Sequence, residues 1–276
     1  MWMNTGGRPT PVSARAISHK RANNPSLSVP PRVEPRAARA GFTLVELLIV
    51  VAIIAIIAAV SIPSLLRSRA AANEGATVGT LRTAATFQAV FRSQGEVDQN
   101  ADGVGEYALL GELSSELALR PGTSRIANPI YMSQQFNTGG NTGNGVASKC
   151  GFFYRIYLSN ATPGDLTATG TDKELGGNSA IGGPAVDPEA IRMQENSYAL
   201  YAWPMELHMT GNRCFFSNES ADIYFTKMEA ATYNNLPATP QANAAYQIGT
   251  SVFRGKIASG TTPGNDTNNW FPAGGH

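Results

Sequence analysis

The chain has 276 residues, of which 42% are hydrophobic and 15% charged, and its formal net charge is +1. This composition is globular, excludes a collagen-like or disordered chain, and allows one large domain or two small ones. The small net charge argues against a strongly basic nucleic-acid-binding protein. Residues 1–41 carry seven Lys or Arg and one acid, whereas residues 42–276 carry 14 basic and 19 acidic residues. A basic leader therefore precedes an acidic body.

The junction between the two parts is an apolar run, residues 42–62, with the sequence FTLVELLIVVAIIAIIAAVSI and a single charge at Glu46. As a helix it would be about 31 Å long, enough to cross the hydrocarbon core of a membrane. The preceding cations place the leader in the cytoplasm and the body on the other side. A signal peptide or plain anchor is the alternative, but no small-residue cleavage site follows the run. A carboxylate inside a membrane span is costly and indicates a function.

The sequence RAGFTLVELL at residues 39–48 resembles the class III signal of type IV pilins and type II secretion pseudopilins. The resemblance implies that a prepilin peptidase cleaves between Gly41 and Phe42 and N-methylates Phe42. Glu46 then becomes the fifth mature residue, whose acid is characteristic of the family, and Pro63 becomes a helix-kinking proline. Gly41 suits close approach of a protease to the backbone because it lacks a side chain.

This resemblance implies a structural subunit of a type IV pilus-like filament. Its partners would be the peptidase and methyltransferase, copies of itself and other pilins, and an inner-membrane assembly platform. The precursor would be a single-pass inner-membrane protein with its head outside the cytoplasm, and the mature subunit would join a pilus or a periplasmic pseudopilus. In a staggered filament, Glu46 of an incoming subunit would pair with the Phe42 amine of the docked one, because a paired charge is tolerated in lipid.

The leader is long for this family. Methionine occurs in it only at Met1 and Met3, so an alternative start at Val33 would leave a nine-residue leader. An N-terminal peptide from upstream of residue 29 in the precursor would contradict that interpretation.

The helix is expected to continue past the membrane, because Val78, Leu81, Ala85 and Gln88 recur at helical spacing. We therefore expect an α+β fold with one long bent helix from Phe42 to about Ser93. Residues 42–62 would form its membrane and filament half, and residues 63–93 the amphipathic half that packs on the head.

An acidic loop follows, in which Asp98, Asn100 and Asp102 alternate before a glycine, with Glu106 close behind. The pattern matches the first half of an EF-hand calcium loop, but position 12 is Leu109 instead of Glu. The alternative is a polar turn built from residues that favour turns. Calcium is the one cofactor that the sequence suggests.

The globular head is expected at residues 94–258, with strands at 149–158, 197–203, 213–217 and 223–227. They would form an antiparallel meander on the amphipathic helix. Residues 137–145 and 159–196 are predicted loops, and 259–276 a flexible tail. Cys150 and Cys214 would form a disulfide outside the cytoplasm, closing a loop of about 65 residues and adding ~4 kcal/mol. Two free thiols are the alternative.

Other functions have weaker support. An anchored enzyme is disfavoured because His208 is the only histidine in the head and no phosphate loop, nucleophile elbow or zinc pair appears. A minor tip subunit could use Tyr198, Tyr201 and Trp203 to bind a ligand, although core packing is the usual role of such aromatics. The pilus is slightly favoured over the secretion pseudopilus.

Overall fold

The computed structural model describes residues 41–120, 125–136, 145–159, 188–236, 238–248 and 255–274. The rest of the leader with its alternative start, nearly all of the 137–145 loop and most of the 159–196 loop lie outside the described residues. The chain divides into two units, Met1–Val50 and Val51–His276. Each unit is described by itself below.

The first helix, α1 (Leu44–Ser93), runs through the boundary between the two units and continues past Pro63. Its apolar stretch reaches a mean hydropathy of 3.0 over 18 residues, none of them buried, and is long enough to cross a membrane. The predicted helix from Phe42 to about Ser93 is therefore confirmed, with a start two residues later.

The second half of α1 packs on the head through a stripe of buried side chains. Leu81, Ala85 and Gln88 of the predicted stripe are buried, and Val78 packs against the same core. Gln88 is tolerated there because its amide donates to the Ala108 carbonyl at 2.7 Å and accepts from the Ala108 N–H at 2.8 Å.

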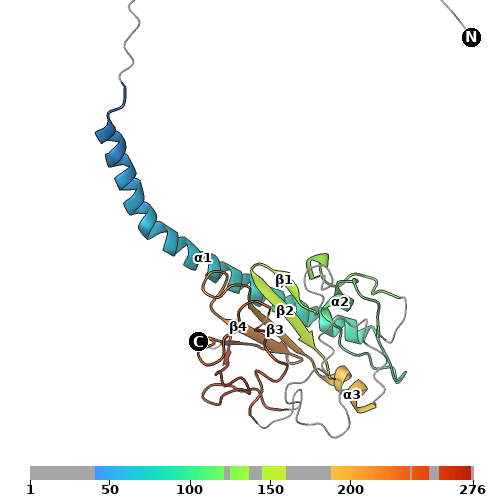
Figure 1. Cartoon of the computed structure of the whole chain (residues 1–276). Helices are drawn as coiled ribbons and strands as arrows, with labels where there is room; N and C mark the ends of the chain where they lie inside the picture. The colour runs from blue at the N-terminus through green and yellow to red at the C-terminus, as the bar shows by residue number, and fades with distance from the viewer. Residues whose placement is uncertain are drawn as a thin grey trace, which may run out of the picture. The chain divides into compact units, whose positions relative to one another are not determined.

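The head is built on one six-stranded antiparallel sheet whose strand order follows the chain, the expected meander (Figure 1). The strands are β1 (Ala147–Lys149), β2 (Phe152–Tyr157), β3 (Ala199–Pro204), β4 (Cys214–Asn218), β5 (Ile223–Thr226) and β6 (Phe271–Pro272). The four predicted strands correspond to β2 to β5, whereas β1 and β6 were not predicted. The described part of the head also contains three short helices: α2 (Leu110–Leu113), the 3-10 helix η1 (Gln134–Phe136) and α3 (Pro188–Asn196).

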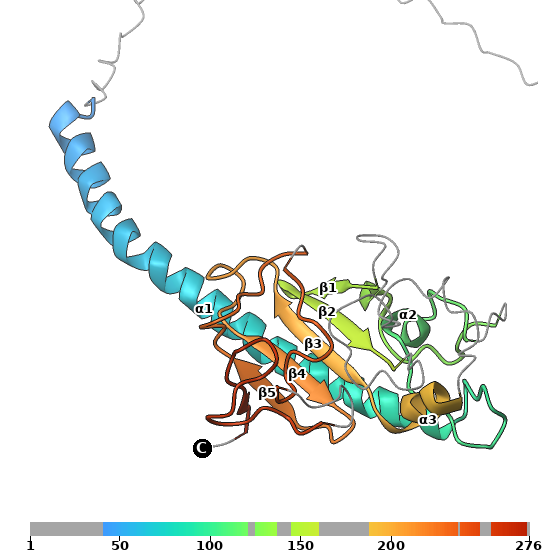
Figure 2. The same ribbon diagram turned by 60° about the horizontal axis from the view of Figure 1, so that its bottom comes forward.

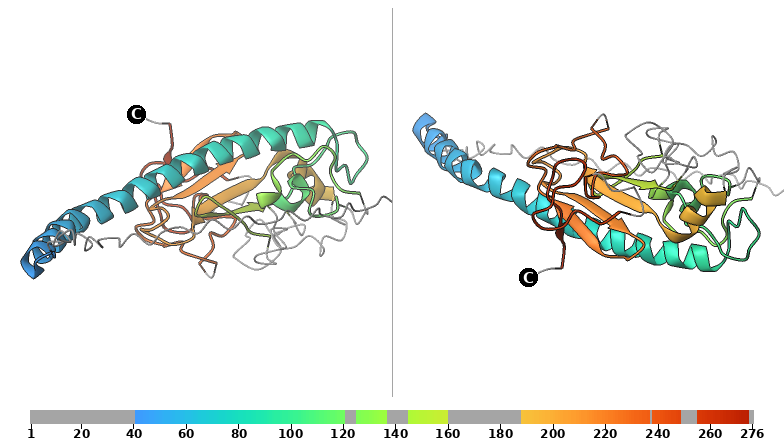
Figure 3. Two further views of the ribbon diagram at one scale, coloured as in Figure 1. Left: turned by 90° about the horizontal axis from the view of Figure 1, so that it is seen from above. Right: turned by 90° about the horizontal axis from the view of Figure 1, so that it is seen from below.

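Each face of the sheet covers its own hydrophobic core, because successive side chains of a strand point to opposite faces. Residues such as Tyr154 and Phe215 face the core that includes Leu81 of α1. On the other face, Trp203 and Phe216 pack with aromatic residues from the C-terminal part of the chain. Figures 2 and 3 show the second half of α1 lying along the sheet, which fixes the α+β class.

The C-terminal segment is more ordered than its composition predicts. β6 pairs with β5, Ser259 forms a bridge with Trp270, and the indole of Trp270 is fully buried. The predicted flexible tail is therefore wrong for residues 259–274. Its Gly-, Thr- and Asn-rich sequence forms turns that carry one aromatic residue into the core.

The predicted disulfide is not present: Cys150 is an exposed free thiol and Cys214 a buried one. Cys150 lies in the turn before β2 and Cys214 begins β4, and β3 lies between those strands. Two strand spacings amount to about 9–10 Å, whereas bridged cysteines have Cα atoms less than ~7 Å apart. The sheet order therefore keeps the two thiols apart.

Candidate functional site

The N-terminus of α1 is held by reciprocal hydrogen bonds between Thr43 and Glu46. The Thr43 N–H and hydroxyl both donate to Glu46 Oε2, at 2.9 and 2.8 Å. The Glu46 N–H lies 3.2 Å from the Thr43 hydroxyl oxygen, which accepts from it. This is a capping box, in which side chains satisfy backbone donors that a helix start leaves unpaired.

The predicted cleavage position lies just outside this capped helix. Gly41 and Phe42 precede α1 without regular secondary structure, and Phe42 is 82% exposed. A Cβ added to Gly41 would meet no atom within 4 Å. The Gly41–Phe42 peptide bond therefore lies one residue before the capping threonine and outside the helical hydrogen-bond pattern.

The capping role of Thr43 was missed in the sequence interpretation, although the signal is visible. A Thr followed three residues later by Glu, directly before an apolar run, is the sequence signature of a capping box. Glu46 was identified for its charge and for its position in the N-terminal signal, and its contact with Thr43 is an addition from the structure.

Known proteins resemble this chain in the same N-terminal segment. The family description "Prokaryotic N-terminal methylation motif" matches residues 36–62. The N-terminal segment is therefore similar to that of type IV pilins. The chain is also 46% identical over 70 residues to the type IV wide pilus major component PilA4 of Thermus thermophilus. That alignment covers 25% of this chain and 50% of the relative, so the chain spans about half the length of the curated relative it matches. No solved structure matches.

Outside this pilin-type segment, the acidic loop adopts the hydrogen bonds of a polar turn. Asp98 Oδ2 accepts from the Gly103 N–H at 3.0 Å, Asn100 Oδ1 from Asp102 at 3.2 Å, and Asp102 Oδ1 from Val104 at 2.9 Å. Within the described ranges, no three Asp, Glu, His or Cys side chains are grouped so that they could hold a metal ion.

The aromatic residues considered for a ligand-binding tip lie in the core. Tyr198, Tyr201 and Trp203 are at most 1% exposed. Tyr201 donates to the Ala242 carbonyl, and the Trp203 indole donates to the Asn235 carbonyl. These three side chains therefore offer no surface to a ligand. The suggestion that a tip subunit would bind a ligand through them is wrong.

Replacing Thr43 with Val is expected to loosen the first turn of α1 by about 1 kcal/mol, since that is the usual cost of losing a cap. Faster amide hydrogen exchange at residues 44–47 of the full chain in detergent micelles would report this loss. Thr86→Val is the matched control, because the Thr86 hydroxyl bonds the Arg82 carbonyl on an exposed part of the same helix. Unchanged exchange at residues 44–47 in Thr43→Val would contradict the capping role.

Proposed function

We propose that the chain is a structural subunit of a type IV pilus-like filament. It is inserted in the inner membrane as a prepilin, cleaved between Gly41 and Phe42, N-methylated, and polymerised through α1. The observation that carries the proposal is a helix whose apolar first half contains no buried residue and whose start, directly after the cleavage position, is capped.

The exposed apolar surface requires a covering. Large apolar residues from Phe42 to Leu66 are between 37% and 82% exposed, a surface far larger than soluble monomers tolerate. Lipid covers it in the precursor, with the seven leader cations on the cytoplasmic side. In a filament, the same helices of neighbouring subunits replace the lipid. The similarity to a type IV pilus major component supports a pilus over a secretion pseudopilus.

Glu46 is the charge that this apolar surface carries. Both donors of Thr43 bind Oε2, so Oε1 is left to accept from a cationic partner. Cleavage creates such a cation at Phe42, and methylation preserves its charge. Pairing of Glu46 with the amine of a neighbouring subunit sets the axial register, because an ionisable group in lipid needs a partner. The processing enzyme and the assembly platform are the further partners of this pathway.

Replacing Gly41 with Leu tests the processing step. The structure leaves open space at Gly41, so a larger side chain does not disturb the fold of the chain. A loss of cleavage would therefore reflect poorer recognition by the peptidase. We expect uncleaved precursor to accumulate in membranes, whereas wild-type protein yields an N-terminal peptide beginning with methylated Phe42. Mass spectrometry of that peptide distinguishes the two.

Gly75→Ala is the control for this experiment, because Gly75 also has open space around its Cβ position but lies within α1. It should be processed normally. A mature wild-type protein that begins at any residue other than Phe42 would refute the cleavage assignment.

A further inference from the structure

The loop between β3 and β4, residues 205–213, holds two exposed methionines in a fixed backbone, and we call it the methionine loop. Met205 and Met209 are 38% and 48% exposed. The Thr210 N–H donates to the Glu206 carbonyl at 2.9 Å, and the Thr210 hydroxyl accepts from the Glu206 N–H at 3.0 Å. Methionine adapts its shape to a partner and is common at binding surfaces. A loop ordered in advance loses little entropy when it binds.

The methionine loop is anchored to α1 where the helix joins the head. The side-chain amide of Asn73 donates to a main-chain carbonyl of the loop at 3.0 Å. Glu74 accepts from the Asn212 N–H at 2.7 Å and from Arg213 Nε at 2.8 Å. Arg213 is therefore neutralised by α1. Glu206 is the loop's only carboxylate, it is exposed, and it has no ion-pair partner within the described ranges.

A groove of about 690 Å³ lies further along the same helix, against the turn between β4 and β5, and we call it the α1 groove. One face of α1 between Arg82 and Ser93 lines it, together with Ala221 of the turn. The hydroxyls of Thr86 and Ser93 bond carbonyls of their own helix, so the groove presents a mainly apolar surface. Arg82 is its only charged residue and has no ion-pair partner in the part of the chain that the structure describes.

The methionine loop cannot fill the α1 groove of its own molecule. β4 begins after the loop and ends before the turn, so the two surfaces lie at opposite ends of that strand. Along α1, Thr86 of the groove is about 20 Å from the loop's anchor at Asn73. A contact between these surfaces therefore joins two molecules. Such a contact uses a different surface on each partner, and its repetition builds an open-ended polymer.

We propose that the methionine loop of one subunit docks in the α1 groove of the next, with Glu206 facing Arg82. The contact rests on the filament function proposed above and adds a contact between heads to the packing of the apolar halves of α1. The volume of the groove lies in the roughly 300–1,000 Å³ range of pockets that enclose drug-sized groups, so it accommodates the two methionine side chains. The carboxylate of Glu206 disfavours an anionic membrane surface as the partner of the loop.

Reversal of the two charges tests the contact. Glu206→Arg and Arg82→Glu should each lower the yield of sheared filaments at least roughly tenfold, because like charges then meet across the interface. The double variant Glu206→Arg/Arg82→Glu restores opposite charges and should return the yield to within about twofold of wild type. Electron microscopy of filaments from cells that express the head-tagged chain measures all three. Rescue in the double variant is specific to a direct pair.

Arg192→Glu is the matched control, because Arg192 is also an exposed helical arginine without an ion-pair partner among the described residues. It lies in α3, outside both surfaces, and should assemble like the wild type. Tryptophan fluorescence of each purified variant in detergent establishes that its head is folded. Mass spectrometry of the mature N-terminus establishes that processing is unchanged.

The outcomes separate this contact from the function on which it rests. Absence of filaments from the wild-type chain would refute the filament function, and the contact with it. Wild-type filaments together with normal assembly of either single variant, or a double variant no better than the single ones, would overturn the contact alone. If the loop instead rests on the membrane, Glu206→Arg should bind anionic lipid vesicles more tightly and Arg82→Glu should assemble normally.

Discussion

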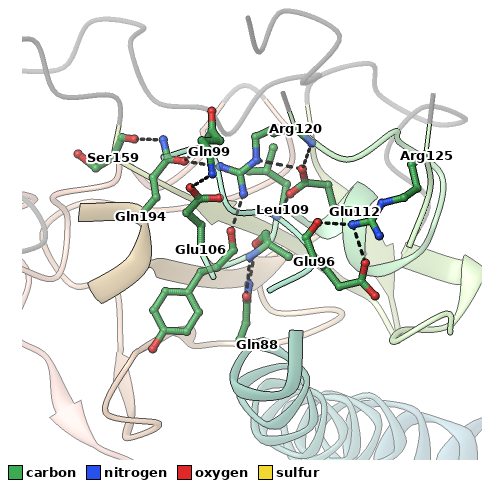
Figure 4. A network of polar contacts seen from close by, with 12 residues as sticks. Gln88, Glu96, Gln99, Glu106, Leu109, Glu112, Arg120, Arg125, Ser159 and Gln194 are labelled. Carbon is green, nitrogen blue, oxygen red and sulfur yellow. Dashed lines mark hydrogen bonds and ion pairs between the residues drawn. The ribbon is translucent and has the colours of Figure 1, made fainter. Parts of the chain in front are cut away.

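Replacing Arg120 with Ala is expected to destabilise the head by about 3–5 kcal/mol, because it leaves a buried carboxylate without its cation. Arg120 and Glu112 form an ion pair at 2.9 Å whose side chains are 2% and 0% exposed. The guanidinium also donates to Gln194 and, at 2.5 Å, to the Tyr107 carbonyl (Figure 4). One side chain thus ties α2 and α3 to the segment that follows α1.

Urea unfolding of the full chain in detergent measures this loss. The fluorescence of Trp203 and Trp270 reports it, since both indoles are fully buried in the head. Arg125→Ala is the matched control: its pair with Glu96 has a similar distance, 3.0 Å, but the Arg125 side chain is 59% exposed. An exposed pair is worth at most about 1 kcal/mol. Equal losses in the two variants would show that burial of the Arg120 pair does not matter.

The double variant Arg120→Met/Glu112→Leu distinguishes the contribution of the ion pair from the cost of leaving the Glu112 carboxylate buried without a partner. Removing both charges avoids an uncompensated buried ion, so the double variant should be more stable than Arg120→Ala alone. A double variant less stable than the single one would mean that the hydrogen bonds that Glu112 accepts from the Leu109 and Arg120 N–H groups outweigh the cost of its unpaired charge.

The features that the sequence predicts well are those with local causes. The apolar run and the spacing of Leu81, Ala85 and Gln88 determine α1, and aromatic and β-branched runs determine the four central strands. The capping box is equally local, since Thr43 and Glu46 are three residues apart. Each of these signals lies within a single element or at its start.

The features that the sequence does not predict depend on strand order or on distant partners. The prediction of a disulfide is wrong because β3 lies between the strands next to the two cysteines. Composition alone cannot reveal this strand order. The tail prediction failed because one residue, Trp270, provides the burial that fixes a polar segment. Glu195 reaches the acidic loop, and Arg120 reaches Gln194, across separations of 95 and 74 residues. A hydrophilic residue gives no local signal that it will be buried and paired.

The Glu46→Val variant is expected to insert into the membrane but to lose filaments by at least roughly tenfold, because it leaves the amine of the neighbouring subunit without a partner charge in lipid. The apolar surface of α1 stays intact, so insertion is preserved. Electron microscopy of sheared filaments from cells that express a head-tagged chain measures the yield. Mass spectrometry of the mature N-terminus shows whether cleavage continues.

Two further variants separate the charge of Glu46 from its capping role. Glu46→Gln keeps an oxygen that accepts from Thr43, and glutamine suits the same position of a capping box. Thr43→Val removes the cap and keeps the charge. If the carboxylate acts by pairing with the amine of a neighbouring subunit, Glu46→Gln should lose filaments as Glu46→Val does, and Thr43→Val should keep them. Normal assembly of Glu46→Gln would instead assign the whole role of Glu46 to starting the helix.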